Sequence, residues 1–161
     1  EALPMGKRVL AIGDGAAQIA KQLYPEAVVD TAQLKPSKKQ QAIPYDALLA
    51  YHILPKLSYL DARKAIETWS KCLRTDGEMQ LYVPSLEWAA EQVLSDKPSP
   101  ALAIHLYGNQ RNREFYISGY TMRDMRNMCE KAGLAVTQAV SGEYTLGDEV
   151  CELHLIVGVK K

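Results

Sequence analysis

Residues 9–17 read VLAIGDGAA, a short apolar run followed at once by two closely spaced glycines. The apolar run over residues 7–12, bounded by the glycine turn, predicts a buried strand. Residues 16–23 carry apolar side chains at helical spacing, so we expect a helix directly after the turn. Gly13 and Gly15 allow the backbone to turn tightly and to approach a ligand, and the start of a helix favours negative charge. The segment therefore predicts a strand–turn–helix unit of an α/β sheet.

The glycine turn alone does not separate a nucleotide site from an ordinary strand–helix connection. Ala17 stands where the dinucleotide fingerprint G-x-G-x-x-G has its third glycine. Asp30 ends the expected strand over residues 26–30, about 15–20 residues after the turn, where Rossmann-like folds place an acid that binds the ribose hydroxyls. The alternative interpretation of Asp30 is a solvated carboxylate at a strand end.

The same alternation of strand and helix patterns continues to the end of the chain. Helices open with a serine or threonine cap, and glycine, proline and aspartate mark the turns. We predict one α/β domain over residues 1–161, with a mostly parallel sheet that ends in an antiparallel hairpin and a ligand site at the carboxyl ends of its strands. The expected strands are 45–51, 78–83, 135–144 and 149–160, the helices 58–73, 85–94 and 121–132, and the loops 33–44 and 95–100, with turns at 75–77 and 146–148.

Charge and composition exclude several classes of function. The chain has 19 basic and 19 acidic residues, so there is no nucleic-acid signature and no basic face for an anionic membrane. No apolar run approaches the roughly 20 residues that span a bilayer, and residues 1–6 do not resemble the start of a signal peptide. The three cysteines lack a C-x-x-C pair and the three histidines lack zinc-ligand spacing. We expect reduced thiols, no metal site, and a cytoplasmic protein of a bacterial or host cell.

Several segments together resemble class I S-adenosylmethionine-dependent methyltransferases. Residues 9–17 resemble motif I, L-D-I-G-C-G-x-G, and residues 42–57 (AIPYDALLAYHILPKL) resemble the segment around the fourth strand of that family. Residues 71–88 (KCLRTDGEMQLYVPSLEW) resemble the segment with the PGG turn. Residues 105–136 resemble the "iyGgq….fH..gft" region of the small predicted methyltransferases of bacteria and their phages. The resemblance covers about residues 7–160 and rests on the order and spacing of the motifs.

The resemblance implies a three-layer, Rossmann-like methyltransferase fold with S-adenosylmethionine as cofactor and a small-molecule or sugar-type acceptor. Gly13 and Gly15 match the glycines beneath the cofactor, and Asp14 stands between them. Asp30 matches the ribose-binding acid, and Tyr51 matches a position close to the sulfonium.

The substrate side of the site is implied by two further segments. His52 lies next to the cofactor position and has a near-neutral reference pKa, so it is the candidate catalytic base; the alternative is a packed histidine at a strand end. Tyr107, Asn109 and Gln110 match a loop that lies over the pocket. Tyr116 replaces the histidine of the family's "fH" motif and is a further pocket residue.

The chain also departs from the family pattern. Ala11 replaces the acid of motif I, and Pro55 and Lys56 replace the Glu-His of the "LEH" sequence. The stretch between Asp30 and Tyr45 is too short for a full helix and a strand, so we expect a sheet shortened around the third strand of the family. Losing one polar anchor costs about 1–3 kcal/mol of binding energy.

These losses keep a second hypothesis open. In it the protein is a catalytically inactive relative that serves as a binding or structural subunit, for example in a viral particle, as a homo-oligomer or with an assembly partner. A third hypothesis, a nicotinamide-dependent oxidoreductase, is supported by the glycine turn alone, and the PGG-like turn and the terminal hairpin argue against it.

Overall fold

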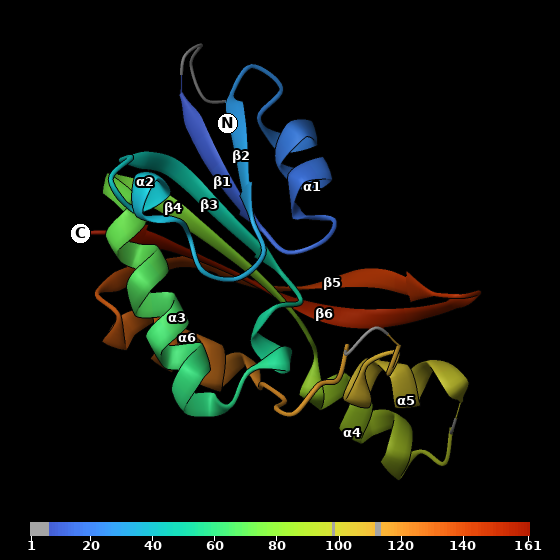
Figure 1. The fold of residues 1–161 in the computed structure, drawn as a ribbon. Coiled ribbons are helices and arrows are strands. Elements are labelled where there is room, and N and C mark those ends of the chain that lie inside the picture. Colours follow the sequence, from blue (N-terminus) through green and yellow to red (C-terminus); the bar gives the residue numbers. More distant parts are fainter. Residues whose placement is uncertain (1–6, 98, 112–113) are drawn as a thin grey trace.

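The computed structural model describes residues 7–97, 99–111 and 114–161 (Figure 1). The expectation about a signal peptide concerns residues 1–6 and lies outside the described residues. The helices and strands are β1 (Arg8–Ile12), α1 (Ala16–Leu23), β2 (Val28–Ala32), α2 (Lys38–Gln41), β3 (Tyr45–Tyr51), the 3-10 turn η1 (Leu54–Lys56), α3 (Tyr59–Cys72), β4 (Leu73–Pro84), α4 (Leu86–Leu94), α5 (Pro100–Tyr107), α6 (Met122–Lys131), β5 (Leu134–Leu146) and β6 (Glu149–Lys160).

The strands form a six-stranded sheet in the order β2-β1-β3-β4-β6-β5. Strands β2, β1, β3 and β4 are parallel, and β6 runs antiparallel to both β4 and β5. The predicted parallel sheet with a terminal antiparallel hairpin is therefore confirmed. Compared with the doubly wound order 3-2-1-4-5-6, the strand beyond β2 is missing from the part of the chain that the structure describes. Only the four-residue helix α2 lies between β2 and β3, which confirms the predicted shortening.

Helices lie on both faces of the sheet and make three layers (Figure 1). On one face α3 and α6 cover the larger core, to which they contribute Trp69 and Met125. On the other face α1 packs Ala16 and Ala20 onto β1 and β3 in a smaller core. The β3 sequence YDALLAY is almost continuously buried because a parallel strand between two helical layers needs apolar side chains on both sides.

The cap residues that the sequence indicates are in place. The hydroxyl groups of Ser58, Ser85 and Thr121 accept hydrogen bonds from backbone N–H groups in the first turns of α3, α4 and α6. Thr121 and Asp124 complete a reciprocal capping box. These helix starts are confirmed because each depends on a local bond that the sequence encodes.

Other local predictions are wrong. Strand β2 begins and ends two residues later than expected, and the expected turn at residues 75–77 is a bulge inside β4, where Tyr45 pairs with Leu73 but Ala47 already pairs with Glu78. Helix α5 was not indicated by periodicity, because its residues are apolar around most of its circumference.

A buried carboxylate ties the amino ends of three strands together. Asp46 is 7% exposed and accepts a hydrogen bond from the Arg8 backbone N–H at 2.9 Å and another from the Arg74 guanidinium. The Lys7 ammonium lies 3.5 Å away. Burial raises the pKa of Asp46, but the bonds from Arg8 and Arg74 and the nearby positive charges outweigh burial and lower it. This carboxylate joins the starts of β1 and β3 to the bulge of β4.

We expect Asp46→Asn to lower the free energy of unfolding by about 2–4 kcal/mol, because it leaves the guanidinium and the ammonium without their charged partner. Urea denaturation measures the change. Asp148→Asn, at the exposed hairpin turn, is the control and should change stability by less than about 0.5 kcal/mol. Equal effects of the two variants would contradict a structural role of Asp46.

Candidate functional site

The glycine turn at the carboxyl end of β1 has the backbone geometry that its sequence suggests. Gly13 and Gly15 have φ angles of +93° and +85°, a conformation that side chains rarely adopt. The Gly13 N–H donates to the carbonyl of Ala32 at 3.1 Å, which fixes the turn to the end of β2. Gly15 is the cap of α1, so the turn leads directly into the start of that helix, and Asp14 between the glycines is exposed.

The end of β3 packs onto this turn. A Cβ atom added to Gly13 would lie 2.5 Å from Cδ1 of Ile53, so the isoleucine side chain lies directly against the glycine. A Cβ atom on Gly15 would meet only Cδ1 of Tyr51, at 3.9 Å, so the space where a side chain would stand is open, and Gly15 is exposed. The structure therefore places Tyr51 beside the glycine turn.

His52 carries two marks of a functional residue. Its φ angle is +53°, and its side chain is 9% exposed with Nε2 lacking a hydrogen-bond partner. Strained backbone and an unpaired buried polar atom each cost free energy, and they concentrate at sites of function. Burial, followed by the nearby His105 and Lys56, lowers the pKa of His52 to about 3. The imidazole is therefore neutral at physiological pH.

His105 of α5 is a second imidazole near His52, and the sequence did not indicate it. Tyr144 of β5 lies edge-on to His52, with the ring centroids 4.9 Å apart, and its hydroxyl lies 2.5 Å from Nδ1 of His105. Nε2 of His105 lies 2.7 Å from the Ser85 carbonyl. A carbonyl only accepts, so Nε2 carries the hydrogen and Nδ1 accepts from Tyr144. Burial lowers the pKa of His105, which keeps this ring neutral.

The expected pocket loop is divided between interior and surface. Tyr116 is half-buried and lines a cavity of about 20 Å³ with His105 and Ser85. Burial, with the charge of Glu114 second, raises the pKa of Tyr116 to about 12.

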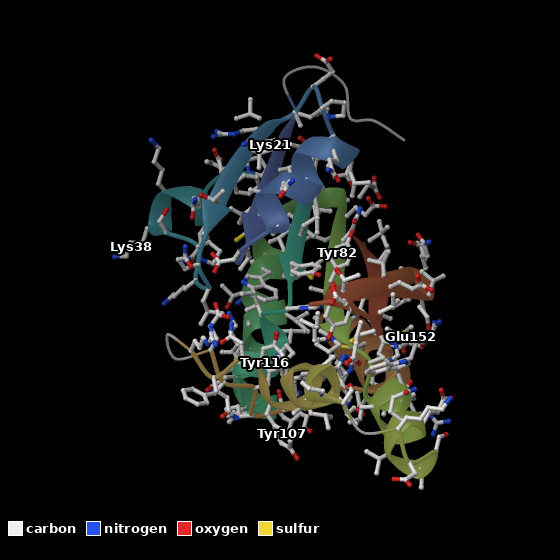
Figure 2. All side chains as sticks on the ribbon, turned by 90° about the vertical axis from the view of Figure 1, so that its right-hand side faces the viewer. Lys21, Lys38, Tyr82, Tyr107, Tyr116 and Glu152 are labelled. Carbon is white, nitrogen blue, oxygen red and sulfur yellow. The ribbon has the colours of Figure 1, made fainter. Side chains whose placement is uncertain are left out.

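The other three loop residues do not enter this cavity. Tyr107 is 58% exposed and lies at the periphery of the molecule, outside Tyr116 (Figure 2). Asn109 and Gln110 are exposed, and the Asn109 amide donates to the Glu114 carboxylate at 2.9 Å. The cavity has room for about one water molecule.

Asp30 does not lie at the glycine turn. It pairs with Leu10 in the middle of β2, and two more residues, about 7 Å of strand, separate it from the carboxyl end. Oδ2 of Asp30 accepts hydrogen bonds from the Arg8 guanidinium and the Tyr45 hydroxyl, both at 2.7 Å. The prediction that Asp30 ends the second strand is therefore wrong, and the strand ends at Ala32.

Within residues 7–97, 99–111 and 114–161, no group of three or more His, Cys, Asp or Glu side chains is arranged to hold a metal ion. No helix in these ranges is both long and apolar enough to cross a bilayer. The three cysteines are buried free thiols, as expected.

Comparison with protein-family models and with curated sequences gives no match. Comparison with solved structures gives several. An S-adenosylmethionine-dependent methyltransferase from Methanosarcina mazei aligns over 98% of this chain and 94% of its own, with a TM-score of 0.66 and 11% identity. The magnesium protoporphyrin IX methyltransferase from Synechocystis PCC 6803 aligns over 98% of this chain and 75% of its own, with a TM-score of 0.59 and 12% identity.

The chain has a Rossmann-like methyltransferase fold. An O-methyltransferase family protein from Burkholderia thailandensis aligns over 96% of this chain, with a TM-score of 0.60 and 15% identity, and here the chain spans about half (51%) of the larger protein. Identities this low establish the fold alone. The expected fold is confirmed, and the roles assigned to individual residues stay predictions.

The low pKa of His52 predicts an acid-sensitive fold. Between the folded-state value of about 3 and the ordinary value of 6.5, the unfolded chain binds more protons than the folded chain. Stability therefore rises with pH in this window and is lost as pH falls. We expect His52 to account for on the order of 2–3 kcal/mol of the stability lost between about pH 7 and pH 4.5.

His52→Asn tests this expectation, because asparagine tolerates the left-handed backbone and does not titrate. Urea unfolding of both proteins at about pH 7 and pH 4.5 should show a smaller loss for the variant. The same loss in both proteins would show that the pKa of His52 is the same in the folded and unfolded chains, and would contradict the expectation.

Proposed function

We propose that this protein binds S-adenosylmethionine across the Gly13–Gly15 turn and transfers its methyl group to a small-molecule or sugar-type acceptor. The observation that carries the proposal is the pair of left-handed glycines between β1 and α1, at the carboxyl edge of a methyltransferase fold. Ligands of doubly wound sheets bind at this edge.

The residues around the turn fit such a cofactor. Backbone N–H groups at the start of α1 suit the carboxylate of its methionine portion. The open space beside Gly15 allows close approach. The half-buried ring of Tyr51 adjoins this space and suits a sulfonium through cation–π attraction. When bound, S-adenosylmethionine supplies a methyl group on a positively charged sulfur.

The chain itself would position the acceptor. Nε2 of the neutral His52 has no hydrogen-bond partner and lies buried beside the rings of Tyr51 and Tyr144, so an acceptor hydroxyl that opened this packing would bond it, which would orient the oxygen. Tyr144 is half-buried and lies edge-on to His52, so its ring would help to exclude water from this nitrogen. In this proposal His52 acts mainly through orientation, since its pKa is far below neutrality. As the C–O bond forms and the C–S bond breaks, S-adenosylhomocysteine leaves and the acceptor oxygen becomes strongly acidic, so a weak base such as Nε2 would take its proton and pass it to water.

Structural neighbours support the choice of cofactor. The Methanosarcina mazei protein is an S-adenosylmethionine-dependent methyltransferase, and the Synechocystis enzyme contains bound S-adenosylhomocysteine. We propose the same cofactor here, in a protein of the cytoplasm.

A second candidate is a non-catalytic relative that acts as a binding or structural subunit, alone as a homo-oligomer or in an assembly such as a viral particle. Three observations favour it. Ala11, in the place of the motif I acid, is 1% exposed in the core, and Asp30 is occupied by Arg8 and Tyr45. The Ile53 side chain lies against Gly13.

Calorimetric titration with S-adenosylmethionine and S-adenosylhomocysteine separates the two candidates. We expect micromolar binding of both and none of NAD, and we expect Gly15→Ala to weaken binding at least about tenfold, because the added methyl group occupies the ligand side of the turn.

Gly133→Ala is the matched control. Gly133 has a φ of +86° with no atom within 4 Å of an added Cβ, so this variant introduces the same backbone strain away from the site. Both variants should lose about 1–2 kcal/mol of stability, and only Gly15→Ala should lose affinity. Absence of binding at millimolar cofactor would reject the enzyme and favour the second candidate.

A further inference from the structure

A cavity of about 580 Å³ lies on the sheet away from the carboxyl edge. It lies over β4 and β6, beside the end of α1, on the face opposite α3 and α6. Figure 2 shows this face, with Tyr82 between α1 and the β5–β6 hairpin. The floor residues Gln80 and Val157 are only 8% and 4% exposed, so the cavity is recessed. Its volume is in the range of small-molecule sites.

One side of the cavity is a chain of hydrogen bonds with a fixed direction. The Tyr24 hydroxyl donates to Oε2 of Glu78 at 2.9 Å, because a carboxylate only accepts. Tyr24 then accepts from the Gln80 amide nitrogen at 2.9 Å, and the Gln80 amide oxygen accepts from the Tyr82 hydroxyl at 2.9 Å. The hydroxyl hydrogens of Tyr24 and Tyr82 are therefore both engaged in hydrogen bonds to protein groups.

The polar atoms on this side of the cavity that remain available to a ligand are hydrogen-bond acceptors. Over the residues that the structure describes, Oε1 of Glu78 makes no hydrogen bond, and the Tyr82 oxygen acts only as a donor. Burial first, and then the charge of Glu78, raises the pKa of Tyr82, so the phenol stays neutral and its oxygen keeps free lone pairs.

The charge and the remaining lining define the ligand further. Three carboxylates, those of Asp46, Asp76 and Glu78, lie with one guanidinium, that of Arg74, which already bonds Asp46. The Lys7 ammonium also lies 3.5 Å from Asp46, so the excess is one negative charge, which Asp76 and Glu78 carry between them. The opposite side of the cavity is aliphatic and consists of Leu155, Val157 and Val159. An anion would be repelled, and a second copy docked symmetrically would bring like charges together.

We propose that this cavity binds an organic ammonium ion with an apolar body. The ammonium donates to Glu78 and Tyr82, and the hydrocarbon packs on Leu155, Val157 and Val159. A small ligand fits better than a basic protein segment because the floor is recessed. The proposal does not depend on methyl transfer, since none of these residues belongs to the glycine turn.

Benzylammonium is the probe, with benzyl alcohol as its neutral counterpart, and amide chemical shifts report binding. We expect saturable binding of benzylammonium in the low millimolar range, with shifts at Gln80, Tyr82 and Val157, and at least about tenfold weaker binding of benzyl alcohol. Added salt should weaken the binding of benzylammonium because part of the attraction is ionic.

Three variants test the assigned contacts. Glu78→Gln keeps an acceptor for Tyr24 and should weaken binding at least about tenfold. Glu143→Gln, at an exposed position of β5, makes the same charge change and should have no effect. Gln138→Lys places an ammonium group at the exposed rim of the cavity, where the substitution should leave the fold intact. The lysine would compete with the ligand for Glu78 and should also weaken binding.

Three results would overturn the proposal. They are no saturable binding of benzylammonium at about 20 mM, equal binding of benzyl alcohol, or an unchanged affinity in Glu78→Gln. Binding of oligolysine without binding of benzylammonium would show that this face docks a basic protein segment instead, and would also reject the small-ligand proposal.

Discussion

The bond between the Gly13 N–H and the carbonyl of Ala32 fixes the point at which β1 leaves the sheet. It requires a left-handed backbone at Gly13, and the same turn requires one at Gly15 before α1 can begin. The end of β3 then has a defined surface to pack on, with Ile53 against Gly13 and Tyr51 beside Gly15. The geometry at the carboxyl edge therefore follows from two positions where a side chain would be strained.

The residues around the glycine turn combine features of a binding site with features of a packed core. Where an enzyme of this fold would expose polar groups to a cofactor, this chain has buried alanine at position 11 and an aspartate bonded to its own arginine and tyrosine. His52, by contrast, combines an unpaired buried nitrogen with a left-handed backbone, and each of these features costs free energy. A binding site needs polar groups with free hydrogen-bonding capacity, whereas a stable core needs apolar or fully bonded groups. Near this edge His52 has the first property, and Ala11 and Asp30 have the second.

Features of short range could be predicted from the sequence, and features of long range could not. The caps at Ser58, Ser85 and Thr121 and the glycine turn depend on neighbouring residues, so the pattern alone indicates them. The end of β2 depends on its register with β1, which placed Asp30 two residues from the edge. The contact of Tyr144 with His105 joins the β5–β6 hairpin to α5, a helix that lacks amphipathic periodicity. Neither residue lies in a sequence pattern that would predict the contact.

The position of β6 has a consequence for how the molecule assembles. This strand comes last in the described chain, yet it lies inside the sheet, paired with β4 on one side and β5 on the other. Glu78 pairs with Val159, half the sequence away, so the pairing closes a long loop of chain. Contacts of such separation form slowly and late. During synthesis β1, β2, β3 and β4 form an incomplete sheet until β6 leaves the ribosome. In that interval the edge of β4 that later pairs with β6 is open to chaperones and to aggregation.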